Sequence, residues 1–246
     1  MIIVNSLSKA FGKGKKRQKV VDNLTLHILP GEVFGFLGPN GAGKSTTIKL
    51  LLGFLKPDDG TMRVREQIVG QEEYRNFIGY LPEFPFFYTH LTARETLFLS
   101  GRLSGMGRKH IRKRSDQLLE ELDLAHAANK KVGDFSKGMK QRLGVVNALL
   151  HDPEILIFDE PMSGLDPLGR YLIKELIIKL KESGKTIFFS SHILSDIEEL
   201  CDRIAVIHRG RLLYAGDIDG FEKKEGQNLE SRFIEIIREA TDAVVV

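Results

Sequence analysis

The most constraining feature of this chain is a glycine-rich segment that runs from Gly38 to Thr46 and reads GPNGAGKST. It fits the pattern G-x-x-x-x-G-K-[ST], in which glycines let successive backbone amides turn inward around phosphate oxygens. The apolar run 33–37 before it is of strand type, and residues 45–52 after it have helical spacing that Gly53 should end. Because a phosphate-binding loop requires this order of strand, loop and helix, an accidental glycine-rich turn is the less favoured interpretation.

The residue types in this segment predict nucleotide chemistry. Lys44 can place a positive charge beside the β- and γ-phosphates, and the Ser45 hydroxyl is a hard oxygen ligand for Mg²⁺. Backbone amides at a helix N-terminus add a site for anions. The predicted phosphate-binding residues are Gly38, Pro39, Asn40, Gly41, Ala42, Gly43, Lys44, Ser45 and Thr46.

Length and net charge limit the classes of protein to which this chain can belong. The chain has 246 residues, enough for one large α/β domain or two small ones, and a net charge of +3, too small to indicate nucleic acid by itself. No apolar run approaches the roughly 20 residues of a membrane-spanning helix, and the first residues lack the pattern of a signal peptide. We therefore expect a cytoplasmic chain whose role at a membrane, if any, requires a separate membrane partner.

Apolar strands alternate with helices in the second half of the chain. The runs 155–158, 186–189 and 204–207 have the composition of fully buried strands, and 171–181 has helical spacing. This alternation predicts a parallel sheet built of βαβ units. From about 85 to 135 the spacing is helical throughout.

The N-terminal region, up to residue 65, and the C-terminal end show other patterns. Residues 1–4 and 24–28 are candidate strands, and 61–65 resembles an edge strand after the turn at 57–60. The basic run 12–19 is best interpreted as a solvated loop, with contact to lipid or to an acidic partner as the alternative. Residues 229–240 predict an amphipathic helix that turns Phe233, Ile236 and Ile237 inward.

Acidic and imidazole side chains follow two of the predicted buried strands. Asp159 and Glu160 end the run ILIF, and His192 comes after the strand that includes 186–189. Ligand sites in parallel sheets form outside the carboxyl ends of strands. Asp159 could therefore hold Mg²⁺, Glu160 could accept a proton from a water that attacks the γ-phosphate, and His192 could hydrogen-bond that phosphate. A helix-start pair and an exposed histidine are the alternatives; they are disfavoured because the chain already has a phosphate loop.

The order of these motifs resembles that of the ATP-binding-cassette (ABC) ATPases. The phosphate loop is followed by the segment 135–142 (FSKGMKQR), then by Asp159-Glu160-Pro161, the turn 163–166 (SGLD) and His192. The resemblance covers residues 1–217. It implies an α/β P-loop NTPase fold with a mainly parallel sheet core, a small N-terminal antiparallel β subdomain and an inserted helical subdomain at about 85–150. Residues 218–246 would form a C-terminal helical extension packed on the same domain.

In this family two cassettes enclose two ATP molecules head to tail. The resemblance implies that Ser136 and Gly138, within the signature segment Ser136, Lys137, Gly138 and Met139, face the ATP bound to the partner subunit. A helix N-terminus capped by Ser136 suits an anion. Asp166 would lie at the dimer seam. Phe11 would stack on adenine with Val20 packing nearby, although Phe11 could equally be a core residue.

Two residues depart from the commonest family pattern. Glu83 stands where many members have glutamine and could still hold Mg²⁺ through its oxygen, which makes Ser45, Glu83 and Asp159 the expected Mg²⁺ ligands. Phe135 and Lys137 stand where leucine and glycine are commonest, and Lys137 adds a charge near the partner's phosphates. Both departures look similar to the cassettes of ABC type-2 exporters.

The resemblance implies an ATP-hydrolysing subunit of a two-component transporter of the exporter type, which dimerises on MgATP and drives a separate membrane permease. It would form a homodimer at the inner face of the membrane, with Lys44, Glu160 and His192 as catalytic residues. The alternative is a soluble ABC ATPase acting on ribosomes, DNA or a protein assembly, but the chain has one cassette and no sustained heptads between Lys44 and Ser136. A cassette that only binds ATP is disfavoured by the complete set of catalytic residues.

Overall fold

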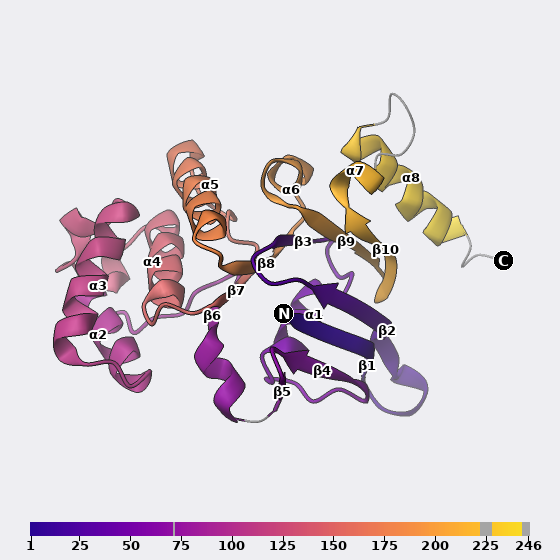
Figure 1. Cartoon of the computed structure of the whole chain (residues 1–246), viewed down its shortest axis with the longest axis horizontal. Coiled ribbons are helices and arrows are strands. Elements are labelled where there is room, and N and C mark those ends of the chain that lie inside the picture. The colour runs from indigo at the N-terminus through magenta and orange to yellow at the C-terminus, as the bar shows by residue number, and fades with distance from the viewer. Residues whose placement is uncertain (71, 222–227, 243–246) are drawn as a thin grey trace. The chain divides into compact units, whose positions relative to one another are not determined.

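The computed structural model describes residues 1–70, 72–221 and 228–242. The chain divides into two compact units, the first made of Met1–Arg75 with Thr186–Val246 and the second of Asn76–Lys185. The first unit contains a mainly parallel set of strands and a small antiparallel sheet, and the second contains two parallel strands and the helices between residues 93 and 182 (Figure 1). These elements confirm the predicted α/β fold with a small antiparallel β subdomain.

The parallel strands of the first unit lead to the phosphate loop. They are β3 (Val33–Leu37), β8 (Thr186–Ser191) and β9 (Arg203–His208), with β3 parallel to both of the others. An antiparallel strand, β10 (Arg211–Asp217), pairs with β9, so the order is β10-β9-β3-β8. Every residue of β3 and β8 is buried, as their apolar sequences predict for strands covered on both faces.

Short helices follow two of these strands. Helix α1 (Lys44–Leu51) comes after β3 and the loop, and α6 (Leu194–Leu200) comes after β8. The backbone of Gly53 has a φ of 66°, in the left-handed region that glycine adopts readily, and α1 ends there as predicted.

The antiparallel sheet corrects one prediction. Its strands are β1 (Ile2–Phe11), β2 (Gln18–Ile28), β4 (Asp59–Val64) and β5 (Gln67–Ile68), in the order β2-β1-β4-β5. The predicted edge strand at 61–65 was wrong, because β4 lies between β1 and β5. A left-handed turn residue, Arg65 (φ 56°), folds the two-residue strand β5 back onto β4, and so short a strand has no apolar pattern to reveal it. The basic run contains a short 3-10 helix, η1 (Gly14–Lys16).

The second unit contains the helical region predicted from residue 85. Helix α2 (Ala93–Leu103) begins with a capping box, in which the Thr92 and Glu95 side chains each accept a hydrogen bond from the other residue's backbone amide. The later helices are α3 (Arg108–Glu121), α4 (Lys137–Leu149) and α5 (Pro167–Glu182). This unit also contains the 3-10 helices η3 (Ala125–Ala127) and η4 (Val132–Asp134), and η2 (Glu72–Phe77) includes the chain position at which the first unit ends and the second begins.

Two parallel strands of the second unit lead to the acidic residues of the predicted site. They are β6 (Ile78–Leu81) and β7 (Ile155–Asp159), paired so that Leu81 lies opposite Phe158. Helix α4 packs closely on β6, since a Cβ atom on Gly79 would lie 2.2 Å from the carbonyl oxygen of Ala148. Only glycine fits at this position.

The C-terminal part of the chain forms α7 (Ile218–Phe221) and α8 (Leu229–Asp242). Phe233, Ile236 and Ile237 are half-buried, as the amphipathic pattern predicts, and α8 contacts α6, α7 and β9. The remainder of the predicted extension, residues 222–227 and 243–246, lies outside the described residues. In the described part of the chain, no helix combines the length and apolar character needed to cross a bilayer.

We expect Gly79→Ala to lower the free energy of unfolding by about 1–3 kcal/mol, because the added methyl group would overlap the backbone of α4. Urea unfolding followed by circular dichroism measures the change. The matched control is Gly107→Ala, since a Cβ atom at Gly107 would meet nothing within 4 Å. Equal effects of the two substitutions would contradict the close packing of α4 on β6.

Candidate functional site

The phosphate loop is held by close backbone approaches that only glycine permits. A Cβ atom on Gly38 would lie 2.4 Å from the carbonyl oxygen of Ile207, and one on Gly43 would lie 2.6 Å from that of Val20. Gly43 also has a φ of 111°, which side chains other than glycine rarely adopt. The glycines that the motif requires are therefore also required by the packing of this loop against β9 and β2.

Lys44 lies inside this loop. Its side chain is 7% exposed, and its ammonium donates a 2.6 Å hydrogen bond to the carbonyl oxygen of Gly38. No acidic residue occupies the first turn of α1, so the positive end of the helix dipole is not neutralised locally. Ser45 is half-buried at the same helix start. The loop thus combines a cation, backbone amides and a hydroxyl, which is the chemistry that a polyphosphate requires.

Phe11 is not a core residue. It ends β1 and is 42% exposed, with the ammonium of Lys9 5.7 Å from the ring centroid. Val20 is half-buried on β2, and its carbonyl oxygen approaches Gly43. Both residues belong to the same unit as the loop. An exposed aromatic ring is available for stacking, so stacking on adenine remains a prediction that this geometry permits.

His192 follows β8 and is exposed. Because β3 and β8 are parallel neighbours with Leu37 opposite Ser191, His192 and Gly38 leave the sheet at the same edge. This is the arrangement expected for residues that share a ligand at the carboxyl ends of parallel strands.

The acidic residues of the predicted site belong to the second unit. Asp159 ends β7 and is 4% exposed, and Glu160 is 8% exposed. Glu83 is half-buried, and it follows β6 at the edge where Asp159 ends β7. Burial, and then the negative charge of Asp159, raise the pKa of Tyr80 to about 12. The Tyr80 hydroxyl therefore stays protonated beside this carboxylate at neutral pH.

The backbone of Glu160 is strained. Gln141, which was not among the predicted site residues, helps to hold it in this conformation. The φ of Glu160 is 51°, in the left-handed region that costs energy for a residue with a side chain. Gln141 is 2% exposed, and its Nε2 donates hydrogen bonds to the carbonyl oxygens of Glu160 (3.5 Å) and Pro161 (3.2 Å). The Ser163 amide donates to the same Glu160 oxygen at 3.0 Å. The sequence could have indicated Gln141, because it is a polar residue on the buried face of the predicted helix.

The signature segment forms the start of α4. Ser136 is the N-cap, as predicted, and its hydroxyl accepts a 3.1 Å hydrogen bond from the Met139 amide. Gly138 is half-buried, whereas Lys137 is exposed. No acidic residue lies in the first turn of α4, which favours an anion at this end.

Asp166 caps a helix of its own subunit. It is the N-cap of α5, and its Oδ1 accepts a 2.8 Å hydrogen bond from the Gly169 amide. Its expected place at a dimer seam remains a prediction.

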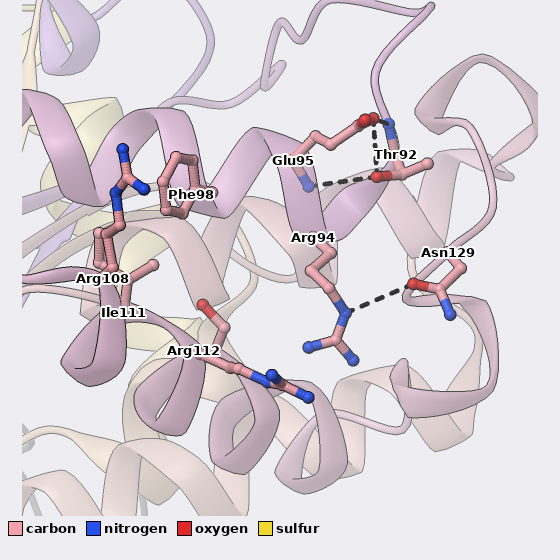
Figure 2. Close-up of a pocket in the computed structure, with 9 residues that line it drawn as sticks. Thr92, Arg94, Glu95, Phe98, Arg108, Ile111, Arg112 and Asn129 are labelled. Carbon is pink, nitrogen blue, oxygen red and sulfur yellow. Dashed lines mark hydrogen bonds between the residues drawn. The ribbon is translucent and has the colours of Figure 1, made fainter.

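A pocket of about 560 Å³ lies between α2 and α3. Figure 2 shows the guanidinium groups of Arg94 and Arg112 directed toward the same part of it, with Phe98 and Arg108 at the other end. Arg94 donates hydrogen bonds to Asp116 and Asn129. Among the described residues, no side-chain hydrogen bond or ion pair engages Arg108 or Arg112. The pocket is therefore cationic with one aromatic wall.

A buried hydroxyl also lines this pocket. Ser115 is 1% exposed, and its Oγ has no hydrogen-bond partner within the described part of the chain. Exposed aromatic side chains precede α2, namely Phe84, Phe86 and Tyr88, which are 65%, 89% and 58% exposed. The second unit thus has both a cationic pocket and an exposed aromatic segment.

Sequence comparison relates the chain to transport proteins. Residues 21–163 match the family described as ABC transporter. A Nostoc protein described as an ABC transporter ATP-binding protein is 45% identical over 89% of this chain and 67% of its own length. The bacitracin transport ATP-binding protein BcrA of Bacillus licheniformis is 44% identical over 94% of this chain and 74% of its own length.

A third relative is named for export. The Nod factor export ATP-binding protein I of Paraburkholderia xenovorans is 41% identical over 86% of this chain and 69% of its own length. The chain spans 61% of the length of a Synechocystis relative described as an ABC transporter ATP-binding protein. Several relatives are thus longer than this chain.

Solved structures agree with the sequence relatives. An ATP-binding subunit of an ABC transporter superposes with a TM-score of 0.87 at 34% identity, covering 96% of this chain and 99% of the other. A dimeric cassette in a post-hydrolysis state with ADP and phosphate superposes with a TM-score of 0.82 at 26% identity, covering 88% of this chain and 98% of the other. The chain therefore belongs to the ABC transporter family, as an ATP-binding subunit of the ATPase type.

Proposed function

We propose that this protein is the ATP-hydrolysing subunit of a two-component ABC exporter, which dimerises on MgATP and drives a separate membrane permease. The observation that carries the proposal is the buried pair Asp159 and Glu160 at the end of β7, in a chain that also has a complete phosphate loop. A cassette that only binds nucleotide has no need of a carboxylate held in a strained backbone conformation. The strained Glu160 therefore supports hydrolysis.

Each residue has one role in this proposal. Lys44 and the loop amides bind the β- and γ-phosphates, and Phe11 stacks on the adenine with Val20 packing beside it. Glu160 accepts the proton of the attacking water, and His192 hydrogen-bonds the γ-phosphate. Gln141 positions Glu160 through the carbonyl oxygens that follow β7.

The residues present fit Mg²⁺. Mg²⁺ is bound by one or two protein oxygens together with phosphate oxygens and water. Ser45, Asp159 and Glu83 would supply the protein oxygens. The ion would neutralise charge that develops on the phosphates.

The proposed dimer pairs each phosphate loop with the signature segment of the other subunit. The capped, acid-free start of α4 at Ser136 and Gly138 suits an anion presented from outside the subunit. A solved relative with 26% identity is a dimer with ADP and phosphate, which supports this arrangement. A complete set of motifs in one chain permits a homodimer.

The proposed permease contacts the second unit. The exposed aromatic residues Phe84, Phe86 and Tyr88 offer apolar area, and Arg108 and Arg112 are cations without partners in the described residues. A cytoplasmic segment of the permease that carries a carboxylate and an apolar side chain would complement both features. This contact would place the subunit at the inner face of the membrane. The names of the bacitracin and Nod factor relatives support transport, and the latter export, over the alternative of a ribosome- or DNA-acting ATPase.

We expect Glu160→Gln to lower the rate of ATP hydrolysis by at least about 100-fold, because a general base contributes 10²–10⁴-fold. The affinity for ATP should remain, since the Lys44 loop is unchanged. Phosphate release and equilibrium ATP binding measure the two quantities. Hydrolysis at the wild-type rate in this variant would remove Glu160 from the proposed mechanism.

We expect the double substitution Arg108→Glu and Arg112→Glu to break the complex with the permease, because it reverses the charge of the pocket. The measurement is co-purification of a polytopic membrane protein with the tagged Glu160→Gln subunit from detergent-solubilised cells with ATP. The matched control is Lys109→Glu with Lys113→Glu, which makes the same charge change at exposed positions of α3 that do not line the pocket. Equal recovery of the permease with both double variants would argue against the pocket as the contact.

A further inference from the structure

Helices α2 and α3 carry more positive charge than the chain as a whole. Residues 93–115 contain seven arginine or lysine side chains and one glutamate, and thus a net charge of +6, whereas the whole chain carries +3. Most of these cations are exposed, namely Arg102, Arg108, Lys109, Arg112 and Lys113. A basic surface of this kind is typical of contact with an anionic partner.

An exposed apolar stripe lies on α2 beside this charge. Leu103 is 81% exposed, and Leu99, one turn earlier on the same helix face, is 39% exposed. Phe98 is 40% exposed and forms a wall of the pocket between α2 and α3. Cations next to exposed apolar side chains suit a membrane surface, where the cations meet lipid phosphates and the apolar groups enter the acyl boundary.

The pocket between these helices offers an anion more than charge alone. The guanidinium of Arg112 is directed toward the same part of the pocket as that of Arg94 (Figure 2). Glu95 also lines the pocket, but its carboxylate accepts hydrogen bonds from the amide and hydroxyl of Thr92. The Ser115 hydroxyl lines the pocket, is buried, and has no hydrogen-bond partner within the described part of the chain. Because an unpaired buried hydroxyl costs free energy, an acceptor that enters the pocket would be stabilised by it.

We propose that this pocket binds the phosphate of an anionic phospholipid. Arg112 would form charge-assisted hydrogen bonds with the phosphate oxygens, and Ser115 would donate its hydroxyl to one of them. Leu99 and Leu103 would contact the acyl chains. A pocket of about 560 Å³ is large enough for a phospholipid headgroup. A zwitterionic headgroup suits the pocket less well, because the Glu95 carboxylate is already engaged by Thr92.

The lipid and the permease segment proposed above would use the same arginine residues at different stages. The lipid would hold the separate subunit at the inner face of the membrane, and a carboxylate of the permease would later replace its phosphate. This inference rests on the proposed place of the subunit at that membrane, but its test requires no permease. Failure of the test would therefore leave the proposed exporter function intact.

Binding of the purified subunit to vesicles, without nucleotide, tests the proposal. We expect co-sedimentation with phosphatidylcholine vesicles that contain phosphatidylglycerol, and little with phosphatidylcholine alone. Arg112→Gln should weaken this binding at least about tenfold, because it removes a charge-assisted contact. The matched control is Lys113→Gln, at an exposed position that does not line the pocket. It should cost no more than about fivefold, the contribution of one cation near an anionic surface.

Two results of this experiment would overturn the proposal. Equal losses in Arg112→Gln and Lys113→Gln would indicate diffuse attraction to the membrane rather than a site in the pocket. Wild-type binding that shows no preference for phosphatidylglycerol would leave the pocket to the permease segment alone.

Ser115→Ala tests the pocket without a change of charge. We expect vesicle binding to weaken about fivefold, because the phosphate loses a donor. The free energy of unfolding in urea should stay the same or rise, because the hydroxyl has no partner to lose within the described part of the fold. Ser104→Ala, at an exposed position outside the pocket, should leave binding unchanged. Unchanged binding or a lower free energy of unfolding in Ser115→Ala would contradict a hydroxyl reserved for the phosphate.

A soluble phosphate ester is the alternative source of the same chemistry. Glycerol 3-phosphate carries the phosphate without acyl chains, and isothermal titration calorimetry measures its binding. We expect it to bind more weakly than the vesicles. Leu103→Ser should weaken only vesicle binding, about fivefold, because it removes an apolar contact. Equally tight binding of glycerol 3-phosphate, or vesicle binding that is unchanged in Leu103→Ser, would assign the pocket to a soluble ester and overturn the lipid.

Discussion

The ammonium of Lys44 is buried and donates a 2.6 Å hydrogen bond to the carbonyl oxygen of Gly38, and the geometry of the first unit depends on keeping it there. A buried charge is stable only when polar groups surround it. The loop must therefore bend its own backbone around the lysine, which requires glycine where the chain passes close to Ile207 and Val20. The fully buried strand β3 fixes the start of the loop, and helix α1 begins at Lys44 itself. A phosphate group could thus replace a backbone carbonyl as the lysine's partner in a loop already formed.

The first unit contains a buried charge, the ammonium of Lys44, and the second contains a strained backbone at Glu160. The left-handed backbone of Glu160 persists only if neighbouring groups determine it more strongly than its own preference does. Gln141 and the Ser163 amide supply such groups, since both donate to the Glu160 carbonyl oxygen. Gln141 belongs to α4, whose first turn is the signature segment. The direction of the Glu160 carboxylate is therefore linked mechanically to the helix that we propose contacts the other subunit's ATP.

Residues at strand ends could be predicted from the sequence, and residues defined by packing could not. Apolar runs place Asp159 and His192 directly after buried strands because strand length and burial are local properties. The central position of β4 was missed, since it depends on a two-residue partner strand with no pattern of its own. The contacts of Gln141 with Glu160 and of Lys137 with Phe84 join segments distant in the chain. Spacing within a segment holds no information on such pairs.

Two residues that the family resemblance assigns to the dimer also stabilise the helices of their own subunit. Ser136 caps α4 and Asp166 caps α5, and each such cap is worth about 0.5–2 kcal/mol of stability. A side chain that accepts a hydrogen bond from its own helix is held in one orientation before any partner arrives. In the proposed dimer, this would lower the entropy lost on association, because these two side chains are already ordered. The caps are short polar residues because the side-chain oxygen must turn back to the backbone amide of the helix's own first turn.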